Sequence, residues 1–175
     1  MIDVFVHRRC IRKLEHSVFA AGRNEIGGVL AAKQVDDGCF LIVDLSVQSD
    51  GTEENFEREP IQHREFISRF HDRVGHKPDQ YNYLGEWHSH PSHPATPSEK
   101  DLLQMQELVE DHEQQSSFLV LMIVKLGLDG KLRGSAHGFR PNLPPVRARL
   151  HGIEEWASQD GYRPVIFVSS KVEGV

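Results

Sequence analysis

The sequence feature that most constrains the fold is an uninterrupted apolar run at residues 118–124, which reads FLVLMIV. With seven residues it is far too short to cross a bilayer, because a membrane-spanning helix needs about 20. The run is followed by an Asp129-Gly130 turn and by a second strand-like segment at 131–139. The two segments are therefore predicted to pair, so that the chain folds around a β-sheet.

Further strands and helices precede this pair. Strands are predicted at 4–6, 26–32, 40–47 and 81–90, with an Asp36-Asp37-Gly38 turn between the second and the third. Apolar residues at the spacing of amphipathic helices predict helices at 8–21, 61–74 and 98–112. The mixture predicts an α+β (mixed α/β) fold, with a single mixed β-sheet flanked by helices.

The C-terminal part of the chain is less regular. Pro141, Pro144 and Pro145 predict a stiff connector, and a short helix at 153–157 and a strand at 164–169 are expected to close the domain. The chain is accordingly divided into a main domain at 1–140 and an extension at 141–175 that packs on the same domain.

Charge and composition exclude several classes of protein. The sequence has 20 Lys and Arg against 26 Asp and Glu, a formal net charge of −6. This acidic balance argues against nucleic acid and membrane surfaces as partners, because both require a basic face. Cys10 and Cys39 supply neither a disulfide framework nor a C-x-x-C zinc site. The N-terminus lacks the apolar run of a signal peptide, so a cytoplasmic location is expected.

Two of the 11 histidines stand in a pattern that suggests a metal site. His88 and His90 are two residues apart on a predicted strand, so their imidazoles point to the same face. Asp101, in the first turn of the next predicted helix, can supply a third ligand. Two histidines and one carboxylate are typical of catalytic zinc, with the fourth tetrahedral position left for water.

These residues also have ordinary structural interpretations. An isolated H-x-H is weak evidence for a metal, and Ser98 with Asp101 fits a helix capping box. The roles are compatible for Ser98, whose hydroxyl could cap the helix and also face the site. His93 is either a surface histidine or a contact to substrate or metal. Trp87 is either a core residue or a wall of the substrate site, and Glu86 either orients a ligand imidazole or is an edge residue.

The complete pattern, H-S-H-x7-S-x2-D from His88 to Asp101, resembles the JAMM motif of MPN/JAB-domain metalloproteases without a gap or substitution. Glu25 stands where the upstream glutamate segment of that family begins. The resemblance covers residues 1–140, and the segment 83–91, YLGEWHSHP, is most similar to the prokaryotic JAB branch. It implies a cytidine-deaminase-like architecture for the mixed sheet and its helices.

The resemblance also implies site roles. His88, His90 and Asp101 would hold one Zn²⁺ whose fourth ligand is water. Glu25 would act as general base, accepting the proton of the water and later delivering it to the leaving amine. The metal and the Ser98 hydroxyl would stabilise the oxyanion.

The implied activity is that of a zinc isopeptidase or peptidase. The family resemblance favours cleavage after the C-terminus of a ubiquitin-like modifier, or of a protein conjugated in the same manner, in bacterial anti-phage operons such as CBASS. E1- and E2-like proteins of the same operon would be its partners. The alternatives are a JAB hydrolase for a sulfur-carrier adduct or a cell-wall or phage-tail peptide, and a non-catalytic MPN scaffold.

Two expectations concern how a substrate tail is bound. A strand that ends at the metal can accept an extended peptide by edge addition. The acidic segment 48–60, in which five acids stand against Arg58, either orders over the substrate tail or is an ordinary solvated loop.

Overall fold

The computed structural model of the protein describes residues 1–53, 59–112 and 116–155. The helices are α1 (Arg8–Ala21), α2 (Pro60–Arg73) and α3 (Glu99–Glu110). The strands are β1 (Asp3–Val6), β2 (Gly27–Asp36), β3 (Cys39–Leu45), β4 (Tyr81–Ser89), β5 (Leu119–Leu126), β6 (Leu132–Arg140), β7 (Leu143–His151) and β8 (Glu154–Glu155). The helices and strands predicted for the first 140 residues are therefore confirmed, with ends that differ by a few residues.

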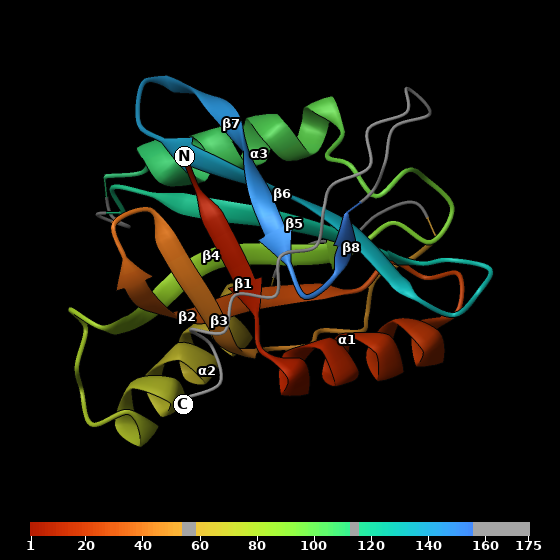
Figure 1. The fold of residues 1–175 in the computed structure, drawn as a ribbon, viewed down its shortest axis with the longest axis horizontal. Helices are drawn as coiled ribbons and strands as arrows, with labels where there is room; N and C mark the ends of the chain where they lie inside the picture. The colour runs from red at the N-terminus through yellow and green to blue at the C-terminus, as the bar shows by residue number, and fades with distance from the viewer. Residues whose placement is uncertain (54–58, 113–115, 156–175) are drawn as a thin grey trace.

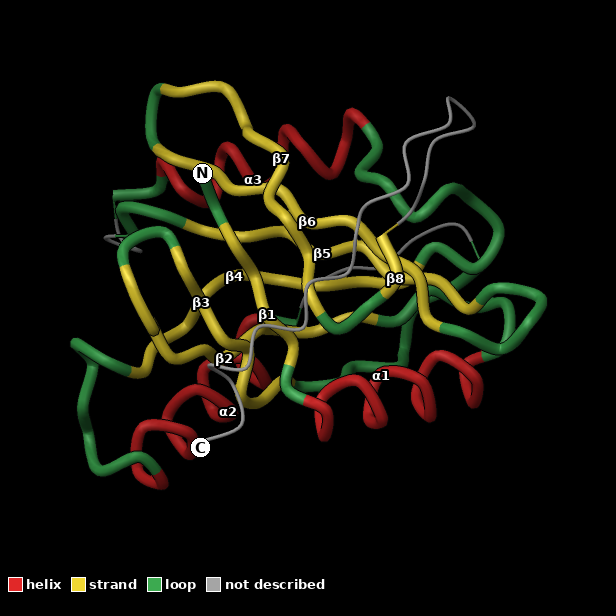
Figure 2. The backbone as a smooth tube through the Cα atoms, in the orientation of Figure 1, coloured by secondary structure: helices red, strands yellow, loops and turns green. Residues whose placement is uncertain are grey.

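The strands form one mixed sheet in the order β5-β4-β2-β3-β1-β7-β6-β8. Because β6 also pairs with β5, the sheet closes on itself (Figures 1 and 2). In the view of Figure 1, α3 lies on the opposite side of the strands from α1 and α2. The predicted mixed α+β fold is confirmed, whereas closure of the sheet was not indicated by the sequence.

Helix α1 packs against the interior of the closed sheet. Its buried residues Cys10, Leu14 and Val18 recur every four positions and join one core with Trp87 and Met122. Such a stripe is the apolar face expected of an amphipathic helix. Gly22 ends the helix with a φ of 63°, a conformation that glycine adopts without strain.

Residues 119–124 of the apolar run lie in β5, which is buried on both faces. Alternate residues face the α1 core: Val120, Met122 and Val124. The residues between them pack under α3: Leu119, Leu121 and Ile123. A strand covered on both sides has no polar face, which explains why the run is apolar at every position.

A bulge in β4 sets which of its side chains face outward. The pairing with β2 shifts between Leu30↔Gly85 and Ala31↔Tyr83, so one residue of β4 is extra. Leu84 and Trp87 consequently both face the α1 core, although residues three apart in a regular strand point to opposite faces. Past the bulge, His88 is therefore on the outer face, beside α3.

The C-terminal part differs from the sequence prediction. Residues 143–151 form β7, which is parallel to β1 and antiparallel to β6, in place of the expected connector. Pro144 and Pro145 fit here because they fall at a register shift, between the pairs Arg140↔Leu143 and Gly138↔Val146, where the ladder is interrupted.

Beyond β7, residues 154–155 form β8 beside β6 instead of the predicted short helix at 153–157. The rest of that helix and the predicted strand at 164–169 lie outside the described residues. The division at residue 140 stays a prediction. Among the described residues, no helix is long and apolar enough to span a bilayer.

The bulge generates a testable prediction for Gly85. Its φ is 144°, and a Cβ added there would lie 2.0 Å from the carbonyl oxygen of Val120 on β5. Gly85→Ala should therefore lower the free energy of unfolding by more than about 3 kcal/mol, since both backbone strain and a clash with backbone contribute.

Gly130→Ala is the matched control, because Gly130 also has a positive φ (74°) but no heavy atom within 4 Å of its added Cβ. Only the strain remains there, about 1–2 kcal/mol. Urea denaturation of both variants measures the difference. Equal losses of unfolding free energy in the two variants would show that the close approach of residue 85 to Val120 does not contribute to the destabilisation.

Candidate metal centre

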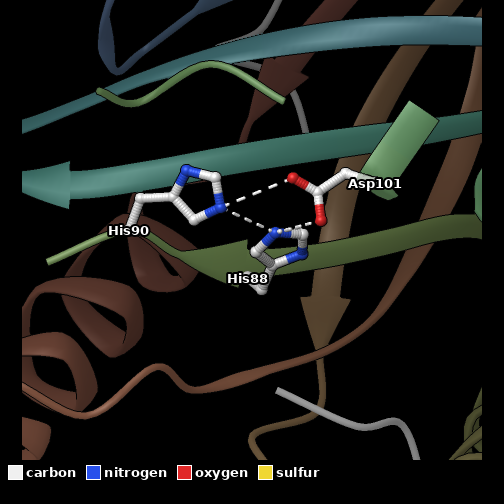
Figure 3. A group of neighbouring side chains, drawn as sticks. All are labelled: His88, His90 and Asp101. Carbon is white, nitrogen blue, oxygen red and sulfur yellow. Dashed lines mark hydrogen bonds and ion pairs between the residues drawn. The ribbon is translucent and has the colours of Figure 1, made fainter. Parts of the chain in front are cut away.

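The end of β4 and the start of α3 bring the three predicted ligands together. Figure 3 shows the rings of His88 and His90 turned toward the carboxylate of Asp101. Potential ligand atoms of the three residues all lie within 4.8 Å of one another. Within the described part of the chain, no other group of three or more histidine, cysteine or acidic residues is gathered in this way.

The distances between the ligand atoms fit a tetrahedral metal. His88 Nε2 lies 3.1 Å from His90 Nε2 and 3.3 Å from Asp101 Oδ1, and His90 Nε2 lies 3.6 Å from Asp101 Oδ2. Ligand atoms bound to a tetrahedral metal at about 2.0–2.1 Å are about 3.3 Å apart. The three side chains could therefore each supply one ligand atom to a shared metal ion.

The tautomer of His90 is fixed by the loop that follows β4. Its Nδ1 lies 2.9 Å from the carbonyl oxygen of Pro94, which can only accept a hydrogen bond, so Nδ1 carries the proton and Nε2 offers a lone pair. Burial and the neighbouring His88 lower the pKa of His90, which favours the neutral imidazole that ligates metals. Nothing in the sequence pattern indicated Pro94, because the group that acts is a backbone carbonyl.

Asp101 is both a helix-capping residue and a candidate ligand. The Ser98 hydroxyl and the Ser98 backbone N–H each donate to Asp101 Oδ2 (2.7 Å for both), and Asp101 N–H donates to Ser98 Oγ (3.2 Å). The capping box is therefore present. Burial alone would raise the pKa of Asp101, but hydrogen bonds from His88 and Ser98 hold it well below its usual range. The carboxylate is thus fixed in its charged form.

Glu25 is buried beside the triad, just before β2. Its backbone N–H donates to the carbonyl of Thr52 (2.8 Å). Burial raises the pKa of Glu25, although His88 opposes the shift. A carboxyl group whose pKa is raised toward neutrality is suited to general acid–base chemistry.

The triad and Glu25 open into one cleft of about 830 Å³. Gln104 and Leu108 of α3 and Asp111, just after its end, line the cleft together with Glu86 of β4 and Leu121 of β5. The cleft is large enough to hold a short stretch of extended peptide.

The structure settles one of the open interpretations and locates the other two residues. Trp87 is a core residue, fully buried, with its indole N–H donating to the carbonyl of Ser46 (2.9 Å). His93 is exposed and lines the cleft, with its ring 6.2 Å from that of His90. Glu86 also lines the cleft and accepts a long hydrogen bond from the Tyr83 hydroxyl (3.5 Å), and its role stays a prediction.

The expectation that a peptide adds to the edge of the strand that carries His88 is wrong. Residues 85–88 of β4 are paired with β2 on one side and with β5 on the other, so this strand offers no edge to a peptide. Of the acidic segment, residues 48–53 lie along the start of β2, where Gln48 bridges to Gly27. Residues 54–58 lie outside the described residues, and closure of the segment over a substrate stays a prediction.

The fold and the site together define an α+β domain with a candidate metal centre of the JAMM kind. The chain belongs to the family described as prokaryotic homologs of the JAB domain, whose sequence model matches residues 7–133. A search of curated proteins found no match.

A comparison with solved structures found one with a similar fold and two of lower similarity. A protein from Desulfitobacterium hafniense, solved in solution, has a TM-score of 0.62 at 18% identity, over 84% of this chain and 90% of that one. A protein from Salinibacter ruber scores 0.49 at 19% identity, over 93% and 95%. A JAB1/MPN domain protein from Archaeoglobus fulgidus scores 0.42 at 17% identity, over 85% and 98%.

The hydrogen bonds between Ser98 and Asp101 predict the effect of removing the Ser98 hydroxyl. Ser98→Ala should weaken metal binding about 10- to 100-fold, because a ligand carboxylate loses the group that orients it. It should also cost about 1 kcal/mol of stability as a lost helix cap.

Titration with zinc against a competing chelator measures the affinity for zinc, and thermal unfolding measures the stability lost with the helix cap. Unchanged affinity together with a large loss of turnover would instead support the predicted role of Ser98 as an oxyanion donor.

Proposed function

We propose that the protein is a zinc metalloprotease that hydrolyses the peptide or isopeptide bond after the C-terminus of a ubiquitin-like modifier, or of a protein conjugated in the same way. The proposed setting is deconjugation or precursor processing in bacterial anti-phage defence, with E1- and E2-like proteins as operon partners. The observation that carries the proposal is the convergence of His88, His90 and Asp101, whose potential ligand atoms lie within 4.8 Å of one another, in a cleft shared with buried Glu25.

The donor set supports zinc as the metal. Two neutral imidazoles and one carboxylate are a common ligand set of catalytic zinc sites, and three protein ligands leave a fourth position open. Bound zinc supplies Lewis acidity and makes hydroxide available near neutral pH.

The chain's own groups can carry the protons of the hydrolysis. Glu25, whose pKa is raised by burial, takes the proton of the attacking water as the new C–O bond forms. It then gives that proton to the nitrogen of the leaving amine as the C–N bond breaks. Burial and the neighbouring His88 lower the pKa of His90, and the Pro94 carbonyl engages its Nδ1–H, so that Nε2 faces the site. No covalent intermediate with the protein is needed.

The substrate tail is proposed to lie in the cleft between α3 and the outer face of β4. This path follows from the pairing of β4 on both sides, which leaves the cleft as the approach to the triad. A cleft rather than a closed cavity suits a substrate that remains attached to a folded protein at each end.

The proposal predicts the effect of changing Glu25. Purified protein should contain about one zinc per chain, and Glu25→Gln should keep the metal and the fold but lower kcat about 10²- to 10⁴-fold, because proton transfer is lost while shape is kept. The assay is cleavage of fusions that join a ubiquitin-like modifier through its C-terminus to a reporter. Glu15→Gln on α1, outside the cleft, is the control and should retain wild-type turnover.

Three outcomes would contradict the proposal in different ways. Protein without zinc, and without loss of stability on chelation, would identify a non-catalytic scaffold. Cleavage of a small amino-acid adduct or a cell-wall peptide, but of no fusion, would identify another JAB hydrolase. Full activity of Glu25→Gln would remove Glu25 from the mechanism.

A further inference from the structure

Ser89, between the two candidate ligand histidines, points away from the metal site. Alternation along β4 turns its side chain inward, and the residue is fully buried. Its Oγ accepts a hydrogen bond from the backbone N–H of Ile26 (3.0 Å), and its backbone N–H donates to the carbonyl of Ile26 (2.8 Å). Ser89 therefore binds both backbone polar groups of the residue that follows Glu25.

This contact lies where the regular ladder has already ended. Strand β2 begins at Gly27, whose partner on β4 is His88. Glu25 and Ile26 precede the strand. The Ile26 N–H therefore donates to the Ser89 side chain, where a regular ladder would offer it a backbone carbonyl. The Ser89 hydroxyl thus links β4, the strand that carries the candidate ligand histidines, to Ile26, the neighbour of Glu25.

The opposite side of the same segment is held by backbone hydrogen bonds. Gly27 and Gln48 exchange two hydrogen bonds (3.1 and 2.7 Å), and Glu25 N–H donates to Thr52 (2.8 Å). Residues 25–27 are therefore clamped from two sides, and on the β4 side the Ser89 hydroxyl is the side-chain element of the clamp.

We propose that Ser89 is a positioning residue that fixes Glu25 relative to His88 and His90. The inference rests on the proposed role of Glu25 as general base. A buried hydroxyl on the inner face cannot touch substrate or metal, so its effect on turnover must pass through the backbone that it binds. A misplacement of about 1 Å in a catalytic group can cost about 10²-fold in rate, and the Ile26 N–H is one covalent step from Glu25.

The first test compares two serine-to-alanine variants. Ser89→Ala should lower kcat at least tenfold while KM and zinc content stay at wild-type values, with the modifier–reporter fusion as substrate. Ser135→Ala is the matched control, because Ser135 is also buried in the sheet but its Oγ has no hydrogen-bond partner among the described residues. The control should retain wild-type kcat.

A second pair separates the hydroxyl from the space that it fills. Ser89→Thr and Ser89→Val add the same volume, but only threonine keeps the acceptor. Threonine should restore most of the activity that valine loses. If threonine and valine are equally impaired, or if Ser89→Ala matches Ser135→Ala, the proposal is overturned.

A double-variant cycle tests whether the effect passes through Glu25. Adding Ser89→Ala to Glu25→Gln should leave the residual turnover unchanged within a factor of two, because the group that Ser89 positions no longer transfers protons. A further tenfold loss in that background, or loss of zinc from Ser89→Ala alone, would show that Ser89 acts on the ligands and would overturn the proposal.

Hydrogen exchange provides a readout that does not depend on activity. The Ile26 amide should exchange at least tenfold faster in Ser89→Ala, with amides in the middle of β2 unchanged, and unaltered exchange at Ile26 would overturn the clamp. If the wild-type protein cleaves no fusion, the proposed function fails, whereas the exchange result still decides whether Ser89 holds this segment.

Discussion

The pairing of the start of β2 with the end of β4 is the interaction on which the site depends. Gly27 lies opposite His88, so a residue just before β2 is necessarily near a residue at the end of β4. Some 60 residues separate Glu25 from His88 in the sequence, so closing the loop between them costs conformational entropy. Several backbone hydrogen bonds between β2 and β4 together fix the register that brings them close. A one-residue slip would turn every side chain of β4 to the other face and separate the histidines from α3.

Burial of β5 on both faces makes this register rigid. Its inner residues contact the α1 core and its outer residues support α3, which carries Asp101. The third candidate ligand is therefore located by the same strand that pairs with the histidine strand. The bulge at Gly85 completes the arrangement, because it lets Leu84 and Trp87 fill the interior while His88 faces outward.

Much of this arrangement could be predicted from the sequence. Apolar periodicity located α1, α2 and α3, and the spacing of His88, His90 and Asp101 predicted a group that the structure does bring together. Local patterns suffice there because a strand and a helix start each fix where their own side chains point. Expectations that depended on distant partners failed. The residues of β7 read as a connector because their prolines fall at an interruption of the ladder, which only the pairing partner reveals.

Dependence on distant partners also explains why the sequence does not predict the groups that hold the site residues in place. Whether β4 has a free edge depends on β5, and β5 follows it only after α3, so the expectation of edge addition could not be tested on β4 alone. The Pro94 carbonyl that fixes His90 is a backbone group, and the sequence does not reveal where such groups point. Ser89 did carry a signal: a small hydroxyl residue at an inward position between two outward histidines is a polar group that must find a buried partner.

The hydrogen bonds between Ser98 and Asp101 serve the helix cap and the candidate metal site at the same time. In an ordinary capping box, the acidic side chain at the third helical position serves only the backbone N–H of the cap. Here one oxygen, Oδ2, accepts both bonds from Ser98, which leaves Oδ1 to face His88. The shorter side chain of aspartate, unusual at a position where glutamate is common, holds the carboxylate close to the helix start. Asp101, in the first turn of α3, is thereby also the residue that presents a charged oxygen to the histidines, so forming the capped first turn orients the candidate ligand.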